Sequence, residues 1–257
     1  KMNIAILGSA GQIGAYLKEY LKEKGHEVVG VDIVDGPQND LRVTPNTYVE
    51  DVIKKSDFVF FLSFDVGGSR YLKKYQHTFE FINNNTRMMA NTFALLEKYN
   101  KRFIFASSQM SNMSYSPYGV MKRVGELHTT ALNGLIVKFW NVYGIEKDME
   151  KAHVITDFIR KGFEEKEFEM MTDGTEERQF LYAEDCCEAL EAVMENYTDF
   201  KPEDPLHITS FHSNTIREVA NIIQGCFSME GMHDVNIKSG LAKDSVQMDK
   251  RNAADTF

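Results

Sequence analysis

Short apolar runs alternate with amphipathic stretches through roughly the first 140 residues of the chain. Runs rich in β-branched and aromatic residues predict strands at residues 3–7, 27–32, 58–62, 102–107 and 135–140. Helical spacing of apolar positions predicts helices at residues 11–24, 44–55, 71–99 and 115–131, the second opening with Thr44 as N-cap and Pro45 as its first residue. Such alternation indicates βαβ units, and therefore an α/β fold with a doubly wound parallel sheet.

The pattern is less regular after about Gly144. Residues 153–163 and 183–196 are predicted to be helical, and residues 168–171 and 206–209 to be strands. Thr215 and Glu218 have the spacing of a capping box, which predicts a further helix with Ile216, Val219 and Ile223 facing inward.

Composition and charge exclude several classes of protein. With 29 basic and 38 acidic residues the net charge is −9, which argues against a nucleic-acid partner. No apolar run approaches the roughly 20 residues of a membrane span, and the start leads straight into a strand without a secretory leader. The three cysteines, Cys186, Cys187 and Cys226, and the seven histidines lack metal-site spacing. We therefore expect a cytoplasmic protein with no metal, whose cysteines are reduced and lie in the core.

The segment between the first strand and first helix carries a dinucleotide-binding pattern. Gly8 permits a tight turn, Gly11 lets the backbone approach a pyrophosphate, and Gly14 lets helix and strand pack closely. The helix start, with Gln12 and Ile13, offers free N–H groups to the phosphates. Asp32 ends the second strand, where its carboxylate suits ribose hydroxyls and repels a 2′-phosphate. The pattern predicts NAD rather than NADP as the cofactor.

A candidate catalytic group follows the fourth strand. Tyr118 and Lys122 are four residues apart and share one face of a predicted helix. A free tyrosine, with a pKa of about 10, is a poor base at neutral pH, but a nearby ammonium and a positive nicotinamide ring favour its ionised form. Ser107 and Ser108 immediately follow the preceding strand, where a hydroxyl can stabilise charge on a reacting oxygen.

These motifs, in this order, resemble those of the extended short-chain dehydrogenases/reductases, the NAD-dependent epimerase/dehydratase family of sugar nucleotides. The resemblance extends through residues 138–144 and 174–185, and so covers nearly the whole chain. It implies a Rossmann-like fold with Ser108, Tyr118 and Lys122 as catalytic residues. It also implies contacts with the sugar-nucleotide diphosphate from Asn141 and Arg178. Further contacts with NAD, or support for its site, are implied for Asp40, Leu41, Phe61, Leu62, Ser63, Asn85 and Ser107.

The resemblance also implies a division of the chain. We expect residues 1–144 to form the NAD-binding domain, with elements near residues 179–209 returning to it. Residues 145–178 and 210–257 are expected to form a small C-terminal substrate-binding lobe. The long helices at 71–99 and 115–131 would pair across a homodimer, or simply cover their own sheet. Because the chain ends at Phe257, earlier than family members usually do, either the lobe is reduced or the chain is incomplete.

The residues after Ser108 discriminate between possible reactions. Dehydratases of the family carry an Asp-Glu pair there, and 3,5-epimerases carry a cysteine, whereas this chain has Gln109 and Met110. We therefore favour a 4-epimerase that passes through a 4-keto sugar, ahead of a 4-oxidoreductase or a dehydratase. Only nine residues separate Ser108 from Tyr118, so the sugar pocket differs from that of most relatives. A reductase of small carbonyl compounds and a non-catalytic dinucleotide sensor remain as alternatives.

Overall fold

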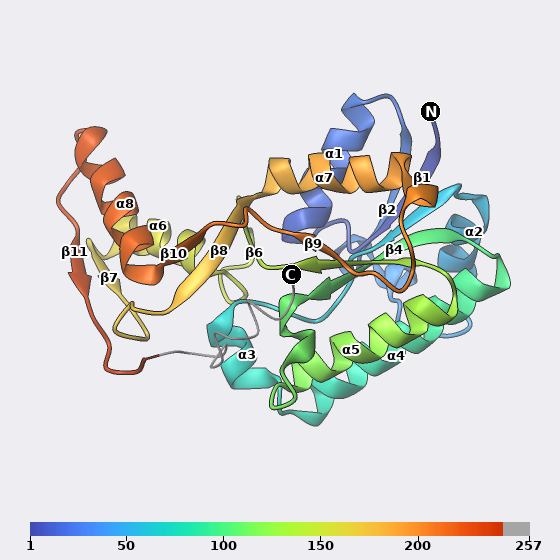
Figure 1. Ribbon diagram of the computed structural model, residues 1–257, viewed down its shortest axis with the longest axis horizontal. Coiled ribbons are helices and arrows are strands. Elements are labelled where there is room, and N and C mark those ends of the chain that lie inside the picture. Colours follow the sequence, from blue (N-terminus) through green and yellow to red (C-terminus); the bar gives the residue numbers. More distant parts are fainter. Residues whose placement is uncertain (244–257) are drawn as a thin grey trace.

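The protein is built around one parallel sheet, seen edge-on through the middle of the computed structural model, which describes residues 1–243 (Figure 1). Its six strands lie in the order β2-β1-β3-β4-β5-β9 and all neighbouring pairs are parallel. Their bounds are β1 Asn3–Leu7, β2 Glu27–Val31, β3 Phe58–Phe61, β4 Arg102–Ser108, β5 Leu135–Phe139 and β9 Leu206–Ile208. The predicted α/β fold class is thus confirmed.

Helices cover both faces of this sheet (Figure 1). α1 (Gln12–Glu23) and α7 (Ala183–Glu195) pack on one face, and α2 (Thr47–Lys55), α4 (Phe79–Lys98) and α5 (Pro117–Ala131) pack on the other. The alternation of side chains along β1 divides the core accordingly: Ala5 and Leu7 join one buried cluster, and Ile4 and Ile6 join the other. Burial on both faces explains why the strands read as continuous apolar runs.

The strand order reverses between β1 and β3, because the chain runs from β1 to β2 on one side and then crosses to β3 on the other. In a doubly wound sheet the loops that leave two such strands diverge, and a crevice opens at their carboxyl ends. The glycine segment after β1 and the segment after β3 therefore border one ligand-sized space.

Two predicted helices have different bounds in the structure. The helix expected from residue 44 begins at Thr47, and the Asn46 side chain, not Thr44, caps it by accepting from the Val49 N–H. The stretch 71–99 is two helices, α3 (Ser69–Tyr75) and α4, because the Thr78 hydroxyl accepts from the Phe81 N–H and starts a new helix. Apolar spacing continues across both junctions, so periodicity alone did not reveal the caps.

Part of the second half of the chain forms a lobe beside the main sheet, whereas β5, α7 and β9 belong to the sheet and the helices that cover it (Figure 1). A three-stranded sheet, β10 (Ser213–Thr215), β8 (Glu177–Tyr182) and β6 (Asn141–Tyr143), leads into it. Beyond lie α6 (Val154–Glu164), α8 (Ile216–Met229) and the paired strands β7 (Glu167–Glu169) and β11 (Asn236–Lys238). The predicted capping box of Thr215 and Glu218 is present at the start of α8. Residues 244–257, assigned to this lobe from the sequence, lie outside the described residues.

Short 3₁₀ turns complete the main domain, at η1 Ile33–Asp35, η2 Pro37–Asn39, η3 Gln109–Asn112 and η4 Tyr197–Asp199. Cys186 and Cys187 are buried as free thiols, but Cys226 is exposed on α8, so its assignment to the core was wrong. It lies on the solvent side of α8, whose inward side carries Ile216, Val219 and Ile223. Within residues 1–243, none of the helices combines the length and apolar character needed to cross a membrane.

Candidate active site

The glycine segment after β1 forms a cradle that larger side chains would fill. Gly8 has a φ of +92°, and a Cβ there would lie 2.7 Å from the backbone N of Ser63, across the crevice. A Cβ on Gly14 would lie 2.1 Å from the Gly8 carbonyl oxygen, so α1 and β1 approach too closely for any side chain. Gly11 occupies the N-cap of α1, so within residues 1–243 the helix has no side-chain hydrogen bond from its N-cap residue. A pyrophosphate fits this arrangement of backbone donors.

Asp32 lies at the end of β2 beside the glycine segment. Its carboxylate accepts the Ala10 N–H at 3.0 Å and the Val34 N–H at 3.2 Å. These bonds fix the carboxylate at the rim of the cradle and leave lone pairs for ribose hydroxyls. The structure therefore brings Asp32 and the glycines together as the sequence predicts.

The other residues predicted on the adenine side are held by local partners. Arg42 forms a fork with Asp40, with both nitrogen–oxygen distances 2.9 Å, and the hydrogen bonds from Arg42 lower the pKa of Asp40. Leu41 is buried, and its carbonyl accepts from the Asn91 side chain at 3.0 Å. Asp40 thus faces a permanent cation, which leaves its carboxylate ionised at neutral pH.

The segment after β3 is positioned by Asn85, which is fully buried in α4. The Asn85 amide accepts from the Asp65 N–H at 2.7 Å and donates to the Asp65 carbonyl at 3.1 Å. Phe61 points into the core, while Leu62 is half-buried and Ser63 donates to the Met88 sulfur. Asn85 therefore fixes the backbone at Asp65, two residues after Ser63, and its fully buried side chain supports the crevice without being exposed in it.

Ser108, Tyr118 and Lys122 meet at the carboxyl end of β4. Tyr118 follows Pro117 in the first turn of α5, which the Ser116 hydroxyl caps. Lys122 lies one turn later; its ammonium donates to the Ala106 carbonyl at 2.6 Å and lies 5.8 Å from the centre of the Tyr118 ring. The Ser108 hydroxyl accepts from the Met110 N–H at 3.1 Å and interacts with Tyr118.

Burial dominates the acid–base properties of this cluster. It raises the pKa of Tyr118 to about 12, a change that the Ser108 hydroxyl partly opposes. It lowers the pKa of Lys122 to about 7, against the attraction of Glu126. The protein by itself therefore keeps Tyr118 as a neutral phenol, and ionising it requires an additional nearby positive charge.

Phe64 and Gly119 belong to the site but were not singled out from the sequence. The Phe64 ring lies edge-to-face with the Tyr118 ring, with 5.7 Å between the ring centres. The Lys122 nitrogen lies 3.9 Å from the centre of the Phe64 ring. A Cβ on Gly119 would lie 2.2 Å from the Met110 carbonyl oxygen, so only glycine lets α5 pack this closely on η3. A glycine directly after Tyr118 was the available sign in the sequence that something packs closely there. The sequence does not show that the neighbour is η3, because that contact joins two separate segments.

Changing Gly119 to alanine is expected to reduce kcat by at least about tenfold, because the added methyl moves Tyr118 away from Ser108. Steady-state kinetics and a thermal melt would measure the effect on activity and on folding. Gly225→Ala is the matched control, since no described residue outside its own stretch of helix lies within 4 Å of its added Cβ. A Gly119→Ala enzyme with the kcat of the wild type would show that this close approach is unimportant.

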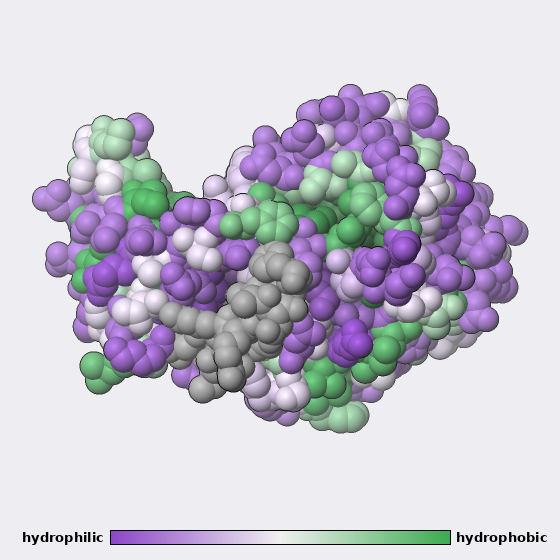
Figure 2. All heavy atoms as spheres, in the orientation of Figure 1, coloured by the Kyte–Doolittle hydropathy of each residue, from purple (hydrophilic) through white to green (hydrophobic). Residues whose placement is uncertain are grey.

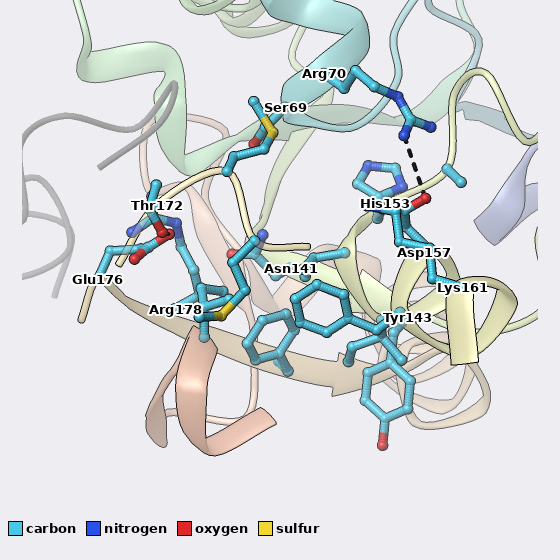
Figure 3. Close-up of a pocket in the computed structure, with 18 of the residues that line it drawn as sticks. Ser69, Arg70, Asn141, Tyr143, His153, Asp157, Lys161, Thr172, Glu176 and Arg178 are labelled. Atoms are coloured by element: carbon cyan, nitrogen blue, oxygen red, sulfur yellow. Dashed lines mark hydrogen bonds and ion pairs between the residues drawn. The ribbon is translucent and has the colours of Figure 1, made fainter. Parts of the chain in front are cut away.

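Asn141 and Arg178 line a pocket of about 480 Å³ between the main sheet and the lobe (Figure 3). They come from the paired strands β6 and β8, which carry both side chains to the same pocket. The Asn141 side-chain oxygen is buried without a hydrogen-bond partner within the described residues. The pocket also has an apolar wall that includes Phe158 and Phe180. Its mixture of apolar surface and a few polar groups is typical of a ligand site.

Further polar residues of this pocket carry no motif and were missed in the sequence. They come from α3, from α6 and its N-cap, and from the segment between β7 and β8: Ser69, Arg70, His153, Asp157, Lys161, Thr172 and Glu176. Arg70 pairs with Asp157 at 3.3 Å in the pocket wall, as the dashed line in Figure 3 shows. Residues so far apart in sequence meet only because the lobe folds back on the segment after β3.

Comparisons with known proteins agree with this arrangement. The model of the NAD dependent epimerase/dehydratase family matches residues 4–208. A Bacillus cytotoxicus UDP-N-acetyl-alpha-D-glucosaminuronate decarboxylase is 28% identical in an alignment of 262 residues that covers 87% of this chain and 79% of the relative. YtcB of Bacillus subtilis, described as an uncharacterized UDP-glucose epimerase, is 26% identical in an alignment of 232 residues that covers 75% of this chain and 72% of the relative.

Solved structures share the fold. An epimerase from Methanothermobacter thermautotrophicus has a TM-score of 0.79 at 18% identity, over 95% of this chain and 81% of that one. MoeE5, solved with UDP-glucuronic acid and NAD, has a TM-score of 0.74 at 22% identity, over 95% of this chain and 87% of that one. The family match spans most of the sequence, and the glycine cradle with Asp32 fits the cofactor. The chain therefore belongs to the NAD dependent epimerase/dehydratase family and is an enzyme with NAD as its cofactor.

Proposed function

We propose that this enzyme inverts carbon 4 of a nucleotide-activated sugar through a transient 4-keto sugar. The observation that carries the proposal is the composition of the Ser108–Tyr118–Lys122 cluster, in which Tyr118 is accompanied by a hydroxyl and an amine but by no carboxylate or cysteine that could act as a second base on the sugar ring. Gln109 and Met110, beside Ser108, are buried and have no acid–base function. Inversion at carbon 4 needs no second base on the sugar ring, whereas dehydration and 3,5-epimerisation both do.

The residues would divide the work as follows. NAD supplies a hydride acceptor when bound. Tyr118 would accept the proton of the sugar 4-hydroxyl and later return it, while Ser108 would hydrogen-bond the same oxygen and stabilise its charge. Lys122, as an ammonium, would favour ionised Tyr118 and bind the nicotinamide ribose. Asn141 and Arg178 would hold the diphosphate, which leaves the sugar free to turn between hydride departure and return.

A nucleotide-sugar 4-oxidoreductase is a second candidate, because it needs the same Tyr118 cluster but releases or reduces the keto sugar. The two candidates differ in net oxidation of the sugar, which can be measured directly.

The test is calorimetry of the protein with NAD against UDP-, GDP-, CDP- and dTDP-sugars, followed by NMR of any sugar that binds. Conversion to the 4-epimer without net NADH supports the epimerase. Stoichiometric NADH with a keto sugar supports the oxidoreductase, and carbon dioxide from a uronate substrate indicates decarboxylation, the reaction named for one relative. If no nucleotide sugar binds, the nucleotide-sugar proposal fails and a small carbonyl substrate becomes the better candidate.

Replacing Arg178 with lysine is expected to raise KM for the nucleotide sugar about tenfold and leave kcat within about twofold. Lysine keeps the charge but lacks the planar fork that binds two phosphate oxygens at once. Lys161→Arg, at another wall of the same pocket, is the matched control for a change of cation. An unchanged KM in Arg178→Lys would argue against a diphosphate at this position.

We also propose that the enzyme is a homodimer through α4 and α5. Figure 2 shows apolar side chains gathered along the lower edge of the molecule, where these helices lie. Phe79, Val120, Val124 and Leu127 are all exposed there, and Phe79 and Leu127 are exposed by 80% and 57%. Exposed apolar residues gathered on adjacent helices are typical of an interface between subunits.

A further inference from the structure

A buried carboxylate lies on the catalytic face of α5 and has no part in the mechanism described above. Glu126 is one turn beyond Lys122 and two turns beyond Tyr118, so the three side chains share one side of the helix. Only 1% of Glu126 is exposed. A carboxylate in such a position is costly unless hydrogen bonds and cations compensate its burial.

Three elements supply that compensation. The Ser107 hydroxyl at the end of β4 donates to one carboxylate oxygen of Glu126 at 2.5 Å. Arg123, on α5 itself, donates to the other oxygen at 3.0 Å. The ammonium of Lys138, on β5, lies 3.7 Å from that oxygen and is itself almost fully buried. The carboxylate therefore ties the catalytic helix to the two strands beneath it.

The hydrogen bond to Ser107 connects this cluster directly to the reacting groups. Ser107 is the neighbour of Ser108, and its backbone pairs with that of Lys138 in the sheet. Glu126 belongs to α5, which carries Tyr118, and its partner Ser107 belongs to the strand end that carries Ser108. Their hydrogen bond therefore joins the two elements that carry the reacting hydroxyls. The relative placement of the two reacting hydroxyls depends on this contact.

Within the described part of the chain, the cations around Glu126 have the opposite charge to its carboxylate. Lys122 and Arg123 come from α5, and Lys138 comes from β5. The His207 imidazole, on the neighbouring strand β9, also interacts with this carboxylate. Burial lowers the pKa of Lys138 and of His207, and Glu126 opposes both effects. Burial likewise lowers the pKa of Lys122 to about 7, and Glu126 is the group that opposes it. Its negative charge therefore favours the ammonium form of Lys122.

We propose that Glu126 is a positioning residue of the active site: its carboxylate aligns Tyr118 with Ser108 through Ser107, and it places a negative charge one helical turn from Lys122. The proposal rests on the proposed roles of Tyr118 and Lys122 for its catalytic consequence, but its electrostatic part concerns the protein alone. The two parts are therefore tested by separate measurements.

The first measurement is the titration of Lys122, followed by NMR in protein labelled with ¹³C-lysine and assigned with Lys122→Met. Glu126→Gln keeps the shape of the side chain and one acceptor oxygen but removes the charge and replaces the other acceptor with an NH₂ donor. We expect the pKa of Lys122 to fall by at least about one unit in Glu126→Gln, because a buried attractive charge has been lost. Glu126→Asp restores the charge and is expected to return the titration to near its wild-type position.

The second measurement is the pH profile of turnover. A lower pKa for Lys122 means that its ammonium form is lost at lower pH, so the descending limb of kcat moves to lower pH by about one unit. At pH 8 we expect kcat of Glu126→Gln to be about tenfold below wild type, with KM within about twofold. Asp51→Asn, which removes a charge exposed on α2, is the matched control and should leave both unchanged.

An unchanged Lys122 titration in Glu126→Gln would overturn the proposal, whether or not nucleotide sugars are the substrates. A shifted titration with a normal pH profile would overturn the catalytic part. Should Glu126→Gln fail to fold, Glu126→Gln combined with Lys138→Met removes both buried charges, and the same fall in the Lys122 titration is required. Failure of the proposed function alone leaves the NMR result standing, so the two failures are distinguishable.

Discussion

Tyr118→Phe is expected to lower kcat by about 10³-fold, because the phenyl ring cannot exchange a proton with the sugar hydroxyl. The ring itself should remain in place, since it packs edge-to-face on Phe64 and lies in the buried cluster of α4 and α5. The affinity for NAD should therefore change by less than about twofold. Single-turnover kinetics with the converted nucleotide sugar, and calorimetry with NAD, would measure both quantities.

The control for Tyr118→Phe is Tyr115→Phe, which removes a half-exposed hydroxyl just before the same helix. It should leave kcat within about twofold of wild type. Substantial turnover in Tyr118→Phe would mean that another group moves the proton, and the proposed mechanism would have to be abandoned.

The second large effect is expected from Gly14→Ala. Its Cβ would lie 2.1 Å from the Gly8 carbonyl oxygen, and because that neighbour is backbone, α1 must move away from β1. We expect a destabilisation of about 1–3 kcal/mol and a loss of NAD affinity of about 100-fold, since the displaced helix start no longer faces the pyrophosphate. Thermal melts and NAD calorimetry would report the two effects separately.

Gly11→Ala is the informative comparison for Gly14→Ala. Its Cβ would lie 3.4 Å from the same oxygen, an ordinary contact, so the fold should be retained while the methyl still crowds the pyrophosphate. Gly14→Ala with wild-type stability and NAD affinity would show that the close approach of helix and strand can relax without cost.

The sequence predicted a structural feature correctly where the residues that cause the feature lie within one short segment. The run of apolar residues in each of β1, β3 and β4 predicted a buried strand because a strand covered on both faces excludes polar residues. The glycines of residues 8–14 predicted a dinucleotide cradle because only glycine permits the positive φ of Gly8 and the close approach at Gly14. The Thr215–Glu218 capping box, likewise local, is present in the structure.

Predictions of helix bounds were wrong where a side-chain hydrogen bond, and not the spacing of apolar residues, sets the end of the helix. The hydroxyl of Thr78 ends one helix and begins another inside a continuous apolar pattern, and Asn46 rather than Thr44 begins α2. Cys226 was assigned to the core because free cysteines usually lie there, yet it faces solvent on α8. A helix cap or the orientation of one side chain depends on only one or two contacts, and the spacing of apolar residues along the sequence does not reveal such contacts.

The sequence by itself determined the family, the cofactor and the order of motifs along the chain, because glycine turns, strand hydrophobicity and helix spacing are properties of contiguous residues. The tertiary structure alone decided which distant groups meet: Gly119 against Met110, Glu126 against Ser107 and Lys138, and Arg70 against Asp157. It also decided the protonation of the site, since burial raises the pKa of Tyr118 and lowers that of Lys122. Burial and long-range contact arise only when the sheet and lobe enclose the site, so no local pattern encodes them.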